Sequence, residues 1–264
     1  MPLPSSLARV KNSITERGLL GTLHALLASV RIRVLTLRPP THPFDLRHNV
    51  DTSGYIKGKN LHPEHLHASS STAYWGTAPS TLKAILENWQ QTLSGSPRDY
   101  TFIDIGCGKG RAIMVASDTP FQKIIGVELN PQLAAIAQKN LATWQTTPHA
   151  CENVTVLNTD ALTFPIPNSP LLFYLYHPFD PPVMQHFVDR LAALTQSHPA
   201  PIDLIYVHPL HGDLILGIPG ASLLWAKNIP HSSEDAAADI FANRSDLCNL
   251  YRLIPHSHAP DVIR

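Results

Sequence analysis

The chain has 264 residues, 44% of them hydrophobic, and its formal net charge is zero. This length fits one large α/β domain with a small appendage, and the balanced charge gives no reason to expect nucleic acid or an acidic partner. The three cysteines, Cys107, Cys151 and Cys248, are widely spaced and form no C-x-x-C pair. This spacing argues against a disulfide framework or a zinc ribbon and favours a reducing, cytoplasmic location.

Residues 1–40 are predicted to form a basic amphipathic helical extension. Apolar residues recur there at helical spacing, and the basic residues face a single acid, Glu16. We expect this helix to pack on the rest of the chain. A membrane-surface contact through residues 1–38 is an alternative, and a nucleic-acid contact is the least favoured one. The apolar run at 19–30 is too short to span a bilayer, and no signal peptide is predicted.

A proline-rich stretch at residues 39–43 ends this helix, because proline cannot continue a helix. Residues 41–72 are predicted to form a loop-rich lead-in to a domain at 73–264. The lead-in contains three histidines, His62, His65 and His67. Since no acid or cysteine joins them at a ligand spacing, we expect no metal there.

Residues 102–111, F-I-D-I-G-C-G-K-G-R, read as a buried strand that breaks into a glycine turn and opens a helix. A dinucleotide site favours G-x-G-x-x-G with bare amides for a pyrophosphate, whereas this loop reads G-x-G-x-G and has Asp104 two residues before its first glycine. A carboxylate there would repel a diphosphate. It would attract the cationic groups of S-adenosylmethionine, so the loop favours that methyl donor.

Two further strands also end in acids. Residues 123–128 read as a buried strand that ends in Glu128, whose carboxylate can accept both ribose hydroxyls, and Asn130 then caps a helix. Residues 154–157 form a third strand, followed by Asp160 and Ala161 with a carboxylate and a free amide suited to adenine. A lone glycine loop or a lone acid is often only a turn or a cap. Their joint occurrence favours a methyl-donor site.

The segments D-I-G-C-G-K-G, G-V-E-L-N-P and N-T-D-A occur in the order found in the class I, Rossmann-like, S-adenosylmethionine-dependent methyltransferases, which the chain resembles over about residues 72–254. The resemblance implies a three-layer α/β fold around a seven-stranded sheet of order 3-2-1-4-5-7-6 with its last strand antiparallel. More narrowly, the chain looks like a bacterial group of undefined substrate in which an F-D-x-R-H-x-V-D-T-like segment, here residues 44–52, precedes the domain.

The same resemblance implies the cofactor-binding residues. The loop holds the methionine end, the second acid holds the ribose and the third segment holds adenine. The positions that match, with their immediate neighbours, are Asp104, Gly106, Cys107, Gly108, Gly110, Glu128, Leu129, Asp160, Ala161 and Tyr176. In many members the segment before the first domain helix covers the donor, which adds Tyr74 and Thr77. Aromatic packing under a loop is an equally good explanation of these two.

The fourth strand, residues 171–176, is followed by His177, Pro178 and Phe179. This segment partly resembles the [D/N/S]-P-P-[Y/F] segment of class I amino methyltransferases, which positions the target amine, and so implies that these three residues are catalytic. His177 stands where Asn or Asp is usual, and one proline is missing. A neutral His177 could accept a hydrogen bond or act as a base. Alternatively, it caps the next helix, which starts at residues 180–182.

A fifth strand, residues 202–207, ends near His208 and His211, so three histidines follow two neighbouring strands and could frame a substrate pocket. We expect no metal among them, because no acid lies nearby in sequence. Residues 223–226 and 250–254 are predicted as the sixth and seventh strands, with a helix between them from Ser232 to Phe241.

These observations predict methyl transfer from S-adenosylmethionine to a nucleophile, with a nitrogen of a protein or small-molecule amine as the first choice. An oxygen or carbon acceptor stays open. So does a module that binds the donor or its product without catalysis, tethered by its N-terminal helix. A nicotinamide-dependent dehydrogenase is a distant third. The sequence does not predict the oligomeric state.

Overall fold

The computed structural model describes residues 34, 35, 37, 39–58 and 73–254. The chain divides into two compact units, Met1–Pro40 and Thr41–Arg264, and the following concerns the second. Most of the predicted basic helix lies outside the described residues, as do His62, His65 and His67. No described helix is both long and apolar enough to cross a membrane.

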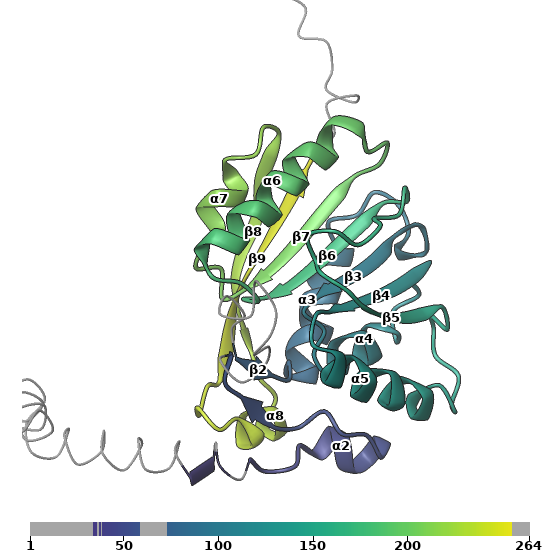
Figure 1. The fold of residues 1–264 in the computed structure, drawn as a ribbon, viewed down its shortest axis with the longest axis vertical. Coiled ribbons are helices and arrows are strands. Elements are labelled where there is room, and N and C mark those ends of the chain that lie inside the picture. Colours follow the sequence, from purple (N-terminus) through teal and green to yellow (C-terminus); the bar gives the residue numbers. More distant parts are fainter. Residues whose placement is uncertain (1–33, 36, 38, 59–72, 255–264) are drawn as a thin grey trace, which may run out of the picture. The chain divides into compact units, whose positions relative to one another are not determined.

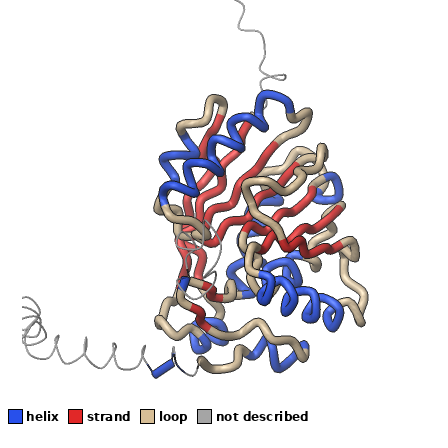
Figure 2. Tube along the Cα trace, in the orientation of Figure 1, coloured by secondary structure: helices blue, strands red, loops and turns tan. Residues whose placement is uncertain are grey.

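A seven-stranded sheet forms the centre of this unit (Figures 1 and 2). Its strands are β3 (Thr101–Ile105), β4 (Lys123–Glu128), β5 (Val154–Asn158), β6 (Leu171–Tyr176), β7 (Ile202–Val207), β8 (Ala221–Pro230) and β9 (Ser245–Leu253). They lie in the order β5-β4-β3-β6-β7-β9-β8, and β9 runs antiparallel to both of its neighbours. Counted within the sheet this is 3-2-1-4-5-7-6, so the predicted order and the antiparallel last strand are confirmed.

Helices cover both faces of the sheet. They are α3 (Pro79–Gln90), α4 (Arg111–Ala116), α5 (Pro131–Trp144), α6 (Pro181–Ser197) and α7 (Gly212–Leu216). Successive residues of a strand point to opposite faces, so Phe102 packs in one apolar cluster with α3, α4 and α5, whereas Ile103 packs in another with α6 and α7. Both side chains are fully buried, as expected for a parallel strand covered on both faces.

Local sequence signals fix where several helices start. The side chain of Asn130 accepts hydrogen bonds from the amides of Gln132 and Leu133, and that of Asp180 accepts one from Val183. Each caps a helix that begins with proline, as the sequence predicts. The Ser232 side chain caps α8 (Ser233–Ala238) by accepting from the Asp235 amide.

Element boundaries differ from the prediction at the carboxyl-terminal edge. The strand predicted at 223–226 extends over the ten residues of β8, most of which are exposed, so its apolar pattern is weak. The helix predicted to continue to Phe241 ends at Ala238. There the Asp239 side chain accepts hydrogen bonds from the amides of Phe241 and Asn243 and turns the chain.

The described part of the lead-in packs with the sheet domain. It forms a short helix, α2 (Pro43–His48), and a strand, β1 (Tyr55–Ile56), which pairs antiparallel with β2 (Tyr74–Trp75). Phe44 of α2 is buried, and its ring stacks on Trp144 at the end of α5 with 5.5 Å between ring centroids. The described residues of the predicted lead-in, 41–58, therefore belong to the same compact unit as the sheet.

Candidate functional site

A pocket lies at the carboxyl ends of the central strands, where the sheet order reverses between β3 and β6; its empty volume, including the open solvent at its mouth, is about 1010 Å³. The predicted residues on its wall are Tyr74, Thr77, Asp104, Gly106, Cys107, Gly108, Glu128, Leu129, Asp160, Ala161, Tyr176, Pro178 and Phe179. Gly110 and His177 are not among the described wall residues. Gly110 instead caps α4 with φ 88°, a conformation that glycine adopts without strain.

Asp104 is a buried carboxylate in this wall, 3% exposed, and it forms no hydrogen bond with any described residue. Burial, with a further contribution from the Glu128 carboxylate, raises its pKa to about 8. An unpaired buried carboxylate is costly unless a cation or a donor reaches it. The chain therefore presents, beside the glycine loop, a group that disfavours phosphate and favours a positive ligand.

Glu128 is held rigidly by backbone amides. One carboxylate oxygen accepts a hydrogen bond from the Gly108 amide and the other from the Asn130 amide, both at 2.8 Å. Burial raises the pKa of Glu128, while the backbone hydrogen bonds oppose that rise. Because the two oxygens together offer about four lone-pair sites, Glu128 keeps acceptor capacity for a diol, as the ribose role requires.

Asp160 and Ala161 lie in a tight turn after β5. Oδ1 of Asp160 accepts a hydrogen bond from the Leu162 amide at 2.8 Å, while the Arg190 guanidinium donates to the carbonyl oxygens of Ala161 and Phe164. These contacts fix the turn in the pocket wall. Oδ2 of Asp160 receives no hydrogen bond from a described residue, so it can accept one from an exocyclic amine.

Tyr74 packs directly over the glycine loop. A Cβ atom on Gly108 would lie 2.3 Å from the Tyr74 ring, and Gly108 also has φ +54°, so this position requires glycine for two reasons. The Tyr74 hydroxyl donates to the carbonyl oxygen of Thr52 at 2.6 Å. Thr77 is held by the Tyr174 hydroxyl, 3.1 Å from its Oγ1.

Arg111 is a wall residue that the sequence reasoning missed, and it is the only Arg or Lys among the described wall residues. Its guanidinium is 5% exposed and donates through Nε to Thr52 Oγ1 at 2.6 Å and through Nη1 to the Gly76 carbonyl at 3.2 Å. Burial lowers the pKa of Arg111, which nevertheless stays charged. A signal was present: Arg111 is the one charged residue in the otherwise apolar helix R-A-I-M-V-A.

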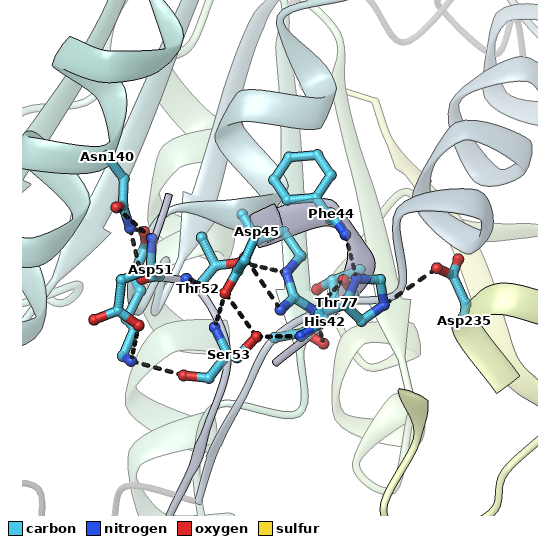
Figure 3. A network of polar contacts seen from close by, with 12 residues as sticks. His42, Phe44, Asp45, Asp51, Thr52, Ser53, Thr77, Asn140 and Asp235 are labelled. Carbon is cyan, nitrogen blue, oxygen red and sulfur yellow. Dashed lines mark hydrogen bonds and ion pairs between the residues drawn. The ribbon is translucent and has the colours of Figure 1, made fainter. Parts of the chain in front are cut away.

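The lead-in positions Arg111 through a polar network, in which Figure 3 labels Asp45 and Thr52. Asp45 is 4% exposed; its Oδ2 accepts hydrogen bonds from the Thr52 and Ser53 amides, and its Oδ1 lies 3.8 Å from Arg111 Nη2. Lys109 of the glycine loop donates to Asp51 Oδ1 at 2.8 Å. The resembling segment at 44–52 thus contacts the start of the loop helix directly.

A second contact ties the lead-in to α8 and α3. Nε2 of His42 lies 3.2 Å from Asp235 Oδ1, and Asp235 also accepts a hydrogen bond from the Ser80 amide at 2.8 Å (Figure 3). Burial by itself would raise the pKa of Asp235, but the hydrogen bonds from His42 and Ser80 bring it down to about 2. Asp235 is therefore ionised over the physiological range and holds three segments together.

Of the three residues predicted as catalytic, two line the pocket and the third points elsewhere. Pro178 and Phe179 lie on the pocket wall, whereas His177 has φ +42° and places its Nδ1 3.1 Å from the Tyr206 hydroxyl. Burial, together with His211 and His208, lowers the pKa of His177, so its imidazole is neutral near pH 7. The helix cap considered for His177 is made by Asp180 instead.

The three histidines at the strand ends do come together. The centroids of the His177 and His211 rings lie 5.5 Å apart, and His208 contributes to lowering the pKa of His177. His208 also has a positive φ, +52°, so two neighbouring strands both end in a non-glycine residue in the left-handed region. Such strain concentrates at functional sites. No group of residues suited to a metal occurs in the described part of the chain.

All three cysteines are free and buried. Burial, reinforced by Asp104 and Glu128, raises the pKa of Cys107 far above its ordinary value. A thiol in this state is a poor nucleophile. A Cβ atom on Gly126 would lie 2.8 Å from the Cys107 sulfur, so Cys107 fills the space between the loop and β4.

These residues fit S-adenosylmethionine. The unpartnered Asp104 carboxylate would receive the donor's ammonium, Glu128 the ribose diol, Asp160 the adenine amine and Arg111 the carboxylate. The described wall carries three acidic side chains against one guanidinium, and this composition suits a ligand with a sulfonium and an ammonium better than a diphosphate.

We expect the affinity for S-adenosylmethionine to increase with pH. With the pKa of Asp104 at about 8 in the free protein, binding of a cation below that pH must release its proton. The dissociation constant should therefore fall by up to about tenfold per pH unit from pH 5.5 to 7.5, where the α-amino group of the donor is still mostly charged. Calorimetry in two buffers of different ionisation enthalpy measures both the affinity and the proton release. A constant affinity without proton release would contradict this role.

Comparison with known proteins gives the same picture. Residues 102–198 match a family model described as a methyltransferase domain. No curated protein matches the chain.

Similar solved structures include the 23S rRNA methyltransferase ErmE, 15% identical over 69% of this chain and 70% of that one, with a TM-score of 0.46. The magnesium protoporphyrin IX methyltransferase of Synechocystis PCC 6803 is 14% identical over 66% and 79%, with a TM-score of 0.45. A SAM-dependent methyltransferase from Aquifex aeolicus is 14% identical over 66% and 89%, with a TM-score of 0.46.

The matched segment begins in β3, shortly before the strand runs into the glycine loop, and ends just after α6. It therefore contains Asp104, Glu128, Asp160 and the H-P-F segment. Over these residues the chain is similar to a methyltransferase domain, and its sheet has the strand order that the resemblance to the class I, Rossmann-like methyltransferases implies.

Proposed function

We propose that the protein methylates the nitrogen of an amine, either on a protein or on a small molecule. The observation that carries this proposal is the aromatic character of the pocket. Its described aromatic wall residues are Tyr74, Trp75, Tyr174, Tyr176 and Phe179. Aromatic faces attract ammonium groups and do not favour a carboxylate or a phosphate.

The end of the pocket beyond β6 supports the same acceptor. Pro178 and Phe179 occupy the wall there, with Val183 of α6 beside them. This part of the wall contributes no charged side chain among the described residues, so a neutral amine bound there would keep its lone pair exposed. The partial likeness to the amino methyltransferase segment points in the same direction.

The residues of the pocket wall contribute placement to the reaction. When bound, the donor supplies an electrophilic methyl group and a good leaving group. Asp104 and Glu128 fix the position of the donor, while Phe179 and Tyr176 confine the acceptor and exclude water. Holding two reactants in a near-attack arrangement can lower the barrier by about 7–11 kcal/mol.

A labelling experiment tests the acceptor atom. The protein is incubated with S-adenosylmethionine tritiated in the methyl group and a lysate of its source organism, and the products are then treated with alkali. Label on nitrogen stays with the acceptor and appears as a methylated amine after acid hydrolysis. Label on a carboxyl oxygen is released as volatile methanol and would overturn the proposal, as would label on carbon. The Asp104→Asn variant measures the background.

A further inference from the structure

Asp246 of β9 is the centre of a buried polar cluster outside the donor-binding residues. It is 1% exposed, its Oδ1 lies 2.9 Å from Nε2 of His208, and its Oδ2 lies 3.1 Å from Nε2 of His231. Burial would raise the pKa of Asp246, but its contacts with His208 and His231 hold it below the ordinary value. The carboxylate is therefore ionised, and it lies within ion-pair distance of two imidazoles.

This cluster reaches the pocket through Tyr176. The Tyr176 hydroxyl lies 3.4 Å from both His208 Nε2 and Asp246 Oδ1, and its ring meets the His208 ring edge-on at 5.3 Å between centroids. Tyr176 belongs to the pocket wall, next to the segment that confines the acceptor. The His208 side chain is 38% exposed, so one side of the ring faces away from the buried carboxylate.

The contact with Asp246 determines which ring nitrogen of a neutral His208 carries the proton. A carboxylate 2.9 Å from Nε2 requires a proton on that nitrogen, which leaves Nδ1 bare. An imidazole oriented by a buried carboxylate, on a side chain that is 38% exposed, is an arrangement that suits a general base. The left-handed backbone at His208 indicates that the surrounding structure maintains this placement at a cost.

We propose that His208, oriented by Asp246, is the base that takes the proton from the acceptor amine. This inference rests on the proposed amine acceptor, because an alkylammonium has no lone pair until it loses a proton. The N–H bond breaks, and the proton moves to Nδ1 of His208. The electron pair left on nitrogen forms the bond to the methyl carbon, and the carbon–sulfur bond breaks with its pair going to sulfur. The imidazolium, paired with Asp246, releases its proton to solvent.

Several titratable groups face this cluster from the elements packed against it. The described ones are Tyr176 on β6, His177 after β6, His211 after β7, His231 after β8, Asp239 after α8 and Cys248 on β9. Burial, with Asp246 and Asp239, raises the pKa of Tyr176 well above its ordinary value, so its hydroxyl stays neutral. The contacts with Asp246 set His208 and His231 apart from the other histidines.

Kinetics with tritiated S-adenosylmethionine test the proposal, using as acceptor the compound labelled in the lysate experiment. His208→Gln should lower kcat by about 10²–10⁴-fold and remove the acidic limb of the kcat profile, with donor affinity unchanged. Asp246→Asn should lower kcat as well and shift that limb. The exposed histidine of α6 provides a control, His186→Gln, which should keep the wild-type profile. A His208→Gln enzyme with normal kcat and an unchanged acidic limb would overturn the proposal.

A measurement without turnover separates this inference from the proposed function. In protein labelled with ¹⁵N-histidine, the His208 resonances should show Nε2 protonated and Nδ1 bare at neutral pH, and Asp246→Asn should abolish this preference. A proton on Nδ1 in the wild type would overturn the base role even if an amine acceptor is found. A lysate without any labelled amine would instead refute the proposed function, and the spectrum would still decide the state of His208.

Discussion

Replacing Asp104 by asparagine should abolish most binding of S-adenosylmethionine while leaving the fold intact. The carboxyl group is buried and unpartnered among the described residues, so once a cationic ligand displaces its proton, its negative charge pairs with that ligand alone. A hydrogen bond between charged groups contributes about 1.5–3 kcal/mol, and its loss should weaken binding about 10- to 100-fold. Calorimetry at pH 7.5 measures this loss. The pH dependence of binding should disappear with it.

The same substitution should stabilise the ligand-free protein at high pH. The folded-state pKa of Asp104, about 8, lies above the unfolded value of about 3.9, so the folded state keeps a proton that the unfolded chain releases. The contribution of Asp104 to the free energy of unfolding is therefore greatest below about pH 4. It falls by up to about 1.4 kcal/mol per pH unit between about pH 4 and pH 8. An asparagine side chain cannot ionise, so the Asp104→Asn variant escapes this loss.

Thermal melts at pH 5 and pH 9 test the predicted effect of Asp104→Asn on stability. Relative to the wild type, Asp104→Asn should gain far more in Tm at pH 9 than at pH 5, where only about one pH unit of the loss has accrued. S-adenosylmethionine should raise the Tm of the wild type far more than that of the variant. Asp213→Asn, which alters an exposed carboxyl outside the pocket, should change neither pattern. A variant that binds the donor as tightly as the wild type would refute the role of Asp104.

The site residues that the sequence predicted are those that belong to short local motifs at the ends of strands. Asp104, Glu128 and Asp160 each lie at or just after the end of a strand, and parallel pairing brings the ends of β3, β4 and β5 to one edge. Once the strand order is known, their proximity follows from geometry. The position of these three acids on one pocket wall could therefore be predicted from the chain.

The rest depends on contacts between distant segments or on backbone conformation. Arg111 is held by Asp45 and Thr52, about 60 residues earlier, and no periodicity in the lead-in signals that contact. His177 has the position in sequence of a catalytic residue, but its positive φ aims the imidazole at Tyr206. Nor does sequence spacing reveal that Asp246 lies beside His208, because that pairing needs β9 inserted next to β7.

Removing the Asp45 carboxylate should both destabilise the protein and weaken donor binding. Asp45 accepts hydrogen bonds from the amide and hydroxyl groups of Thr52 and Ser53, and it faces the buried Arg111 guanidinium. Asp45→Ala leaves those donors and that cation without their partner, and breaking a buried pair in this way costs about 3–5 kcal/mol. Chemical denaturation should show this loss as a lower midpoint with an unchanged slope.

The loss of donor binding should have a specific cause. Thr52 both accepts a hydrogen bond from Arg111 and, through its carbonyl, fixes Tyr74 over the glycine loop, so a loosened lead-in frees two wall residues at once. Arg47→Ala is the matched control in the same segment, because Arg47 pairs with Glu234 at the surface, where ion pairs contribute little. That control should keep both stability and donor affinity. Equal damage from both substitutions would mean that the lead-in acts as a general cover and that Asp45 has no special role in holding Arg111.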